Sequence, residues 1–198
     1  MTPSPRHPHR RAALVAATRK VAAQRGLAQT NVRAVAAEAD VSAGSVLYYF
    51  PTFDELVYTC VEGVLEEFYD RRDRIAQTLP DPADRMRSLI TAGIPDVVSD
   101  DLRMVYESIG LVREKPQYGP LMRSIVERQV LLYRTTIELG VGLGVFTPSR
   151  TAGEIARNIV ALEDAYDLYP LVGLDLDRQA CREAVLAYAS QALGADLL

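Results

Sequence analysis

Apolar residues recur with helical spacing along most of the chain, and this periodicity limits the fold more than any other feature. The clearest case is the segment 53–68, which is preceded by Pro51 and begins with a capping pair, Thr52 and Glu55. Side chains three and four residues apart share one face of a helix, so the segment predicts an amphipathic helix. Its apolar positions are Phe53, Leu56, Val57, Cys60, Val61, Val64, Leu65 and Phe68.

Similar patterns predict further helices on both sides of this segment. One is expected from about residue 8 to 25 and a long one from about 120 to 139. No segment shows the alternation of a half-buried strand. The chain is therefore predicted to be all-α, with about nine helices. Their starts are expected at residues that favour a first helical turn, namely Thr30, Ser42, Pro82, Asp100 or Asp101, Thr147–Pro148 and Asp175.

The residue types that most enzymes need are scarce in this chain. Histidine occurs only as His7 and His9, so a Ser-His-Asp or Cys-His site would have to recruit the proline-rich leader. No cysteine or histidine pair has zinc-site spacing, and no phosphate-binding or nucleophile-elbow motif occurs. The glycines at 140, 142 and 144 follow a helical pattern, which favours a helix end over a dinucleotide loop. We expect no enzymatic activity, catalytic residue, metal site or cofactor.

The sequence gives no indication of export or membrane insertion. No run approaches the roughly 20 apolar residues of a membrane-spanning helix. The N-terminal segment lacks the apolar core of a signal peptide, so a cytoplasmic protein is expected. Cys60 and Cys181 fall within apolar helical patterns, which favours buried, reduced thiols over a disulfide between them.

Charge is divided unevenly along the chain. Residues 1–50 carry seven basic and two acidic side chains, whereas residues 51–198 carry 15 basic and 24 acidic ones. A basic segment on a larger acidic body favours a local module that binds a polyanion, with chance clustering of arginine as the alternative.

Residues 30–56 have the pattern of a helix-turn-helix. Two short helices flank a tight turn at residues 39–41, and both are too short to persist without packing on their neighbours. Asp40 occupies the place where the turn needs a left-handed residue. Small residues at 43–45 would let the second helix approach a DNA groove, and Tyr48 and Tyr49 offer hydroxyl groups and rings. These features alone leave DNA binding and a purely structural role open. The expected core is Val32, Val35, Ala36, Val41, Val46 and Phe50.

The segment from Gly26 to Phe50 resembles the DNA-binding domain of the tetracycline-repressor (TetR) family. The positions that carry the resemblance are Thr30, Val35-Ala36, Ala39-Asp40-Val41-Ser42, Gly44, Tyr48-Tyr49-Phe50 and Leu56. The resemblance implies a DNA-binding domain over residues 1–52 and a ligand-binding and dimerisation domain over residues 53–198. It further implies a homodimer through the last two helices, a double-stranded DNA operator and a small organic effector. Residues 161–166 resemble the eighth helix of the subgroup that contains choline-responsive betaine regulators.

The same resemblance assigns the residues that are expected at DNA. Three positions depart from the family pattern: Asp40 replaces the usual glycine, Leu47 replaces an aromatic residue and Phe53 replaces a lysine that contacts phosphate. The expected DNA-binding residues are Thr30, Asn31, Arg33, Ser42, Ala43, Gly44, Ser45, Leu47, Tyr48, Tyr49 and Thr52.

An effector pocket is expected among the fourth to eighth helices. Glu163 and Asp164 beside Tyr166 could receive a cation, with the tyrosine ring adding a cation–π contact. Alternatively, they could pair with Arg157 or with an arginine of a second subunit.

Residues 51–198 carry an excess of acidic side chains and no histidine, so we expect a mostly apolar organic effector whose charge, if any, is positive. An anionic ligand stays open as the alternative, because any of four arginines could turn inward, namely Arg103, Arg123, Arg128 and Arg134. The candidate ligand-binding residues are Phe68, Met104, Tyr106, Glu107, Tyr118, Met122, Ile125, Tyr133 and Glu163.

Together these features predict a ligand-responsive transcriptional regulator. We expect a repressor that an effector releases from its operator by shifting the population of two conformers. The alternatives are an all-α small-molecule carrier and a protein-interaction bundle without DNA binding.

Overall fold

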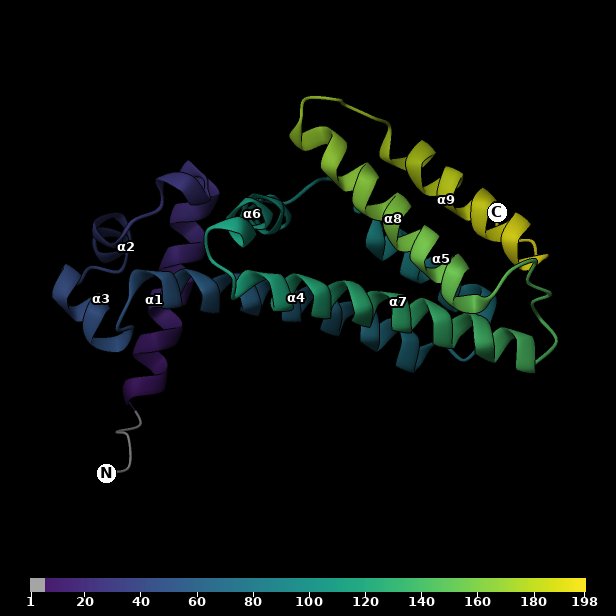
Figure 1. Cartoon of the computed structure of the whole chain (residues 1–198), viewed down its shortest axis with the longest axis horizontal. Helices are drawn as coiled ribbons and strands as arrows, with labels where there is room; N and C mark the ends of the chain where they lie inside the picture. The colour runs from purple at the N-terminus through teal and green to yellow at the C-terminus, as the bar shows by residue number, and fades with distance from the viewer. Residues whose placement is uncertain (1–5) are drawn as a thin grey trace. The chain divides into compact units, whose positions relative to one another are not determined.

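The computed structural model describes residues 6–198, and this part of the chain contains nine α-helices, two short 3-10 turns and no strand (Figure 1). The prediction of an all-α fold with about nine helices is confirmed. In chain order the elements are α1 (Arg6–Arg25), η1 (Leu27–Gln29), α2 (Val32–Glu38), α3 (Ala43–Tyr49), α4 (Phe53–Thr78), α5 (Pro82–Gly93), α6 (Asp100–Ile109), η2 (Gly110–Arg113), α7 (Tyr118–Gly142), α8 (Ala152–Leu171) and α9 (Arg178–Leu193).

The described residues fold into two compact units. The first runs to Glu66 and also includes Ser99–Leu121, whereas the second combines Glu67–Val98 with Met122–Leu198. Helices α4 and α7 each begin in the first unit and continue into the second. None of the helices within residues 6–198 has both the length and the apolar character needed to cross a membrane.

The first unit holds the helix-turn-helix on α1. Its core contains Val35, Ala36, Val46 and Phe50, as predicted, and Val32 and Val41 pack against that core while partly buried. The turn between α2 and α3 is left-handed at Asp40, with φ of 52°, which confirms the expectation for this position. Two helices of seven residues each are thereby held in place by tertiary packing. The residues of α1 and α4 in this core are Leu14, Ala17, Val21 and Leu56.

Of the two N-caps predicted for the helix-turn-helix, one is confirmed and the other is wrong. Ser42 caps α3 as expected, since its side chain accepts a hydrogen bond from the Ser45 backbone N–H at 3.1 Å. Thr30 does not cap α2, and that prediction is wrong. The Asn31 side chain accepts from the N–H groups of α2, because Thr30 is buried and its hydroxyl donates to the Gly26 carbonyl at 2.8 Å.

The later helix starts were predicted close to the correct residue but often not at it. Pro82 occupies the first turn of α5 as predicted. Ser99, instead of Asp100 or Asp101, caps α6. The start predicted at Thr147–Pro148 is wrong, because Thr151 and Glu154 form a capping box on α8. Likewise the cap of α9 is Asp177, two residues after Asp175.

The second unit is built around an apolar core shared by α5, α7, α8 and α9. At the end of α7, Gly140 allows the Phe146 ring to lie directly on the helix backbone, where a Cβ atom would overlap the ring. Cys181 belongs to this core and Cys60 is buried in the first unit, and neither forms a disulfide. The largest residues of the core are Met86, Leu89, Ile90, Ile94, Tyr133, Ile137, Phe146, Ile155 and Ile159.

Candidate nucleic-acid interface and a buried polar cluster

Helix α3 buries one face and exposes the other. Val46 is fully buried, whereas Tyr48 is 74% exposed and Leu47 is 44% exposed. Gly44 is also exposed, so no bulky side chain covers the first turn. A short helix with an open first turn and outward tyrosine can enter a DNA groove, with base edges and phosphates within reach of its side chains.

The remaining predicted DNA residues fall into three groups. Asn31, Arg33, Ser42 and Thr52 are exposed, and Ala43, Ser45 and Tyr49 are half-buried on α3. The Thr52 hydroxyl accepts from the Glu55 N–H at 3.1 Å, and the Ser42 and Ser45 hydroxyl groups lie 3.0 Å apart. Thr30 differs from the others, because its buried hydroxyl is already bonded to Gly26. Its contribution is to the turn that positions α2.

Helix α1 supports the end of α3 in a way that sequence reasoning missed. The Arg11 guanidinium donates to the backbone carbonyl of Tyr49, lies 3.9 Å from the centre of the Phe50 ring and pairs with Glu55 at 3.3 Å. Arg11 therefore binds the carbonyl group of the last residue of α3, where a positive charge is favourable. The basic cluster at residues 6–11 was the available signal, but it did not indicate which arginine turns inward.

Helix α6 is joined to the helix-turn-helix by two carboxylates within the first unit. Arg19 of α1 donates two hydrogen bonds to Asp101, at 2.5 and 2.6 Å. Glu107 accepts from the Leu27 backbone N–H at 2.6 Å, at the start of η1. Glu107 was predicted as a ligand-binding residue, and the structure gives its carboxylate this backbone partner.

The predicted ligand-binding residues are divided between the two units. Met104, Tyr106, Glu107 and Tyr118 lie in the first unit. Tyr118 is buried against the Tyr58 ring, and among the described residues its hydroxyl has no hydrogen-bond partner; burial raises its pKa to about 12. The candidates that lie in the second unit are Phe68, Met122, Ile125, Tyr133 and Glu163.

The structure brings two of those candidates, Tyr133 and Glu163, onto one buried arginine. Arg72 of α4 donates to Glu163 Oε2 at 2.8 Å and to the Tyr133 hydroxyl at 2.7 Å. The Tyr133 hydroxyl donates in turn to Glu163 Oε1. Glu163 is 2% exposed, and its carboxylate lies so close to Gly93 of α5 that a Cβ atom there would overlap it.

Burial dominates the electrostatics of this cluster. Loss of hydration raises the pKa of Glu163 to about 7, although the Arg72 charge and the Tyr133 and Arg72 hydrogen bonds act in the opposite direction. A second buried acid, Asp167, pairs with Arg178, and burial raises its pKa to about 6. Both carboxylates therefore depend on an arginine partner to remain charged near neutral pH.

The pairing of Glu163 corrects one prediction and reveals a missed residue. For Glu163 the alternative of an ion pair with Arg157 is wrong, because its partner is Arg72. Arg72 continues the apolar stripe of α4 four residues beyond Phe68, and this spacing places it on the buried face. An arginine on such a stripe signals a buried partner, but the partner on α8 is 91 residues away in sequence.

Helix-turn-helix geometry with an exposed recognition helix defines a class of DNA-binding regulators. Residues 14–58 match the family model described as bacterial regulatory proteins, tetR family. Residues 14–58 therefore form a DNA-binding domain of the kind that this family model describes, and the findings together support a TetR-family regulator. The resemblance found in the sequence is thereby confirmed.

Relatives and solved structures extend the likeness over almost the whole chain. The HTH-type transcriptional regulator BetI of Burkholderia cenocepacia is 27% identical over 191 residues, which cover 94% of this chain and 95% of that protein. A TetR transcription regulator from Haloarcula marismortui has the same fold, with a TM-score of 0.87, 22% identity and coverage of 94% and 99% of the two chains. A transcriptional regulator from Saccharomonospora viridis, solved in complex with choline, has a TM-score of 0.85, 19% identity and coverage of 94% and 98%.

Proposed function

We propose that this protein represses transcription by binding an operator through α3 and the start of α2, and that a small organic effector releases it. The observation that carries this proposal is the open first turn of α3 beside the exposed Tyr48, in a domain that matches the TetR family model. Residues 1–52 would form the DNA-binding domain, and residues 53–198 would bind the effector and the second subunit. Neither alternative, a carrier or an interaction bundle, accounts for this exposed helix.

Removing the Tyr48 ring is expected to weaken operator binding by about 1–3 kcal/mol, because the exposed ring and hydroxyl would lose their DNA contacts. The measurement is a gel-shift titration with the DNA upstream of the protein's own gene. Tyr48→Phe separates the hydroxyl from the ring. Val97→Ala is the control, since Val97 is equally exposed at 75% but lies in the second unit. Equal affinity of Tyr48→Ala and the control would exclude α3 from the interface.

We further propose that two subunits associate through the outer surface of α8 and α9. Four small side chains, Ala161, Ala180, Ala184 and Ala187, are exposed on these helices, which allows close approach of a second copy. A dimer would also supply enough DNA contacts for specific operator binding, because one seven-residue recognition helix alone offers too few.

We propose an organic cation as the effector, bound in the second unit beside Tyr133 and Glu163. The choline complex of the Saccharomonospora regulator supports this class. Glu163 is already paired with Arg72, so a cation must compete with that guanidinium for the carboxylate. Such competition would change how α4 and α8 pack, and α4 continues into the unit that contains the recognition helix. Effector binding and DNA release could thereby be linked.

Choline at about 100 times its Kd is expected to raise the melting temperature by roughly 5–10 °C, because a ligand that binds only the folded state stabilises it. The matched control is 3,3-dimethyl-1-butanol, which has the shape of choline without its charge. The charge-specific shift should come with loss of bound operator in the gel shift. Equal shifts with both compounds, or none with either, would contradict a cationic effector of this kind.

A further inference from the structure

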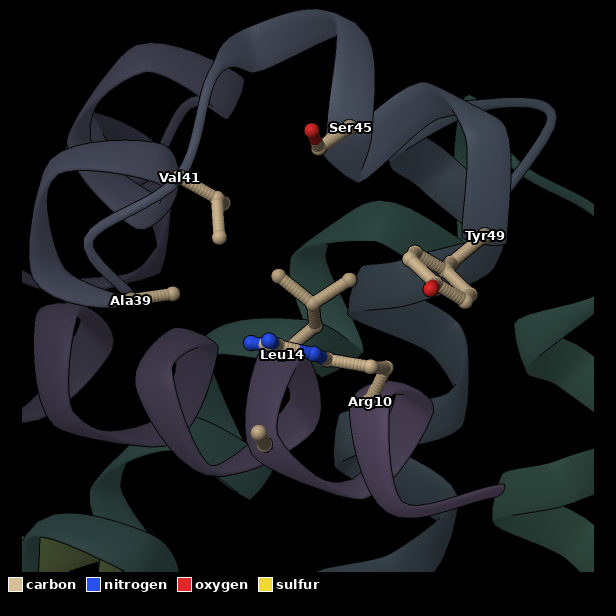
Figure 2. A pocket seen from close by; sticks show the side chains of 7 residues that line it. Arg10, Leu14, Ala39, Val41, Ser45 and Tyr49 are labelled. Atoms are coloured by element: carbon tan, nitrogen blue, oxygen red, sulfur yellow. The ribbon is translucent and has the colours of Figure 1, made fainter. Parts of the chain in front are cut away.

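A small hollow lies between α1 and α3, on the helix-turn-helix itself (Figure 2). Figure 2 shows Arg10 lying along the α1 side, with Ser45 and Tyr49 opposite it on α3. Apolar side chains form the floor, and the groups that can donate hydrogen bonds lie around it. The lining residues are Arg10, Ala13, Leu14, Ala39, Val41, Ser45 and Tyr49.

The charge of Arg10 is not balanced within the part of the chain that the structure describes. Three other basic residues of α1 are paired, with Arg11 bonded to Glu55, Arg19 to Asp101 and Lys20 to Glu38. No carboxylate within residues 6–198 pairs with Arg10, and its side chain is exposed. A guanidinium that is left over beside two hydroxyl groups suits a tetrahedral anion with several acceptor oxygens.

His7, one turn before Arg10, ties the same end of α1 to the aromatic residues of α3. The centre of its ring lies 4.9 Å from that of Tyr49 and 6.4 Å from that of Tyr48, both in tilted arrangements. Tilted ring pairs at these separations are favourable. His7 therefore restrains the two tyrosines, and the side of α1 that carries Arg10 stays close to the exposed face of α3.

We propose that α1 is a second DNA-contacting helix, on which Arg10 binds a backbone phosphate together with the hydroxyl groups of Ser45 and Tyr49, while His7 positions the tyrosine rings. The inference rests on the proposed operator binding. A DNA phosphate is favoured over a free anion because the hollow borders the helix that presents Tyr48 to solvent. Such a contact fixes the protein on the duplex without reading its sequence.

The probe is a DNA duplex that the wild-type protein selects from a random library. Arg10→Ala should weaken binding to this duplex about tenfold at 100 mM salt. The slope of log K against log salt should fall by about 2 per dimer, since two phosphate contacts are lost. Arg10→Lys should keep the slope. Arg25→Ala is the matched control, because Arg25 is also exposed and unpaired among the described residues but lies about 22 Å along α1. Circular dichroism and melting curves verify that each variant is folded.

Different failures of this experiment have different meanings. If the wild type binds no selected duplex, the proposed function is wrong and the inference falls with it. If the wild type binds but Arg10→Ala matches Arg25→Ala in affinity and salt slope, only the α1 contact is wrong. A third arm uses inorganic phosphate alone in a melting assay. If phosphate stabilises the wild type but not Arg10→Ala, and DNA binding is equal, the hollow is a free-anion site and the DNA assignment is overturned.

Discussion

Glu163→Met is expected to lower the free energy of unfolding by about 3–5 kcal/mol, because it leaves a buried guanidinium without its counter-charge. Arg72 cannot shed its proton, and its side chain is only 8% exposed. Arg72→Met should cost less, because the carboxyl of Glu163, with a pKa of about 7, can take up a proton and become neutral. The order of the two losses, measured by urea unfolding at pH 7.5 and fixed protein concentration, tests this account of the cluster.

Two further variants make the test specific. The double variant Arg72→Met/Glu163→Met removes both charges and should recover most of the loss, to within about 1–2 kcal/mol of the wild type. Glu138→Met breaks an exposed pair with Arg134 in the same unit and should cost no more than about 0.5 kcal/mol. A Glu163→Met variant as stable as Glu138→Met would mean that the buried pair is not an essential part of the fold. If the double variant is less stable to urea than either single variant, the side chains of Arg72, Tyr133 and Glu163 stabilise the fold through packing alone.

Ala184→Arg is expected to convert the dimer to monomers at micromolar concentration and to lower operator affinity by about 100-fold or more, since linked binding of two recognition helices is lost. Ala184 is exposed on α9 of its own subunit, so arginine can be accommodated there without damage to the core. Ala156 is unsuitable for this purpose, because it is 0% exposed within its own chain. Sedimentation equilibrium gives the mass, and anisotropy gives the affinity.

The matched control for the dimer is Gln179→Arg, which adds the same charge at an exposed position on a different side of α9. It should remain dimeric and bind operator as the wild type does. If Ala184→Arg stays dimeric, the subunits associate through another surface. If the wild type is itself monomeric at micromolar concentration, the dimer proposal is wrong.

The helix-turn-helix could be predicted because its signals are local. The left-handed turn depends on Asp40, the start of α3 depends on Ser42, and the buried face follows from helical spacing. Where several capping residues stand close together, sequence alone could not choose among them. Ser99, Asp100 and Asp101 are such a run, and only the path of the chain before α6 decides that Ser99 is the cap.

The buried cluster of Arg72, Tyr133 and Glu163 could not be predicted from local sequence signals. Glu163 and Tyr133 were both expected at a site, but neither their contact nor the role of Arg72 was predicted. These residues come from α4, α7 and α8, so their meeting depends on how three helices pack. The α1 residues His7 and Arg10 were also missed as neighbours of α3, because their spacing along the sequence says nothing about which helix they approach.

The proposed function depends on sequence-specific binding of duplex DNA by the wild-type protein. The most direct measurement is fluorescence anisotropy of a selected duplex and of a scrambled duplex of equal length and composition, over a range of salt concentrations. The selected duplex is expected to bind at least about 1,000-fold more tightly than the scrambled one near physiological salt, and both affinities should fall steeply as salt rises. Equal affinity for the two duplexes, or no binding at low salt, would contradict the proposed function.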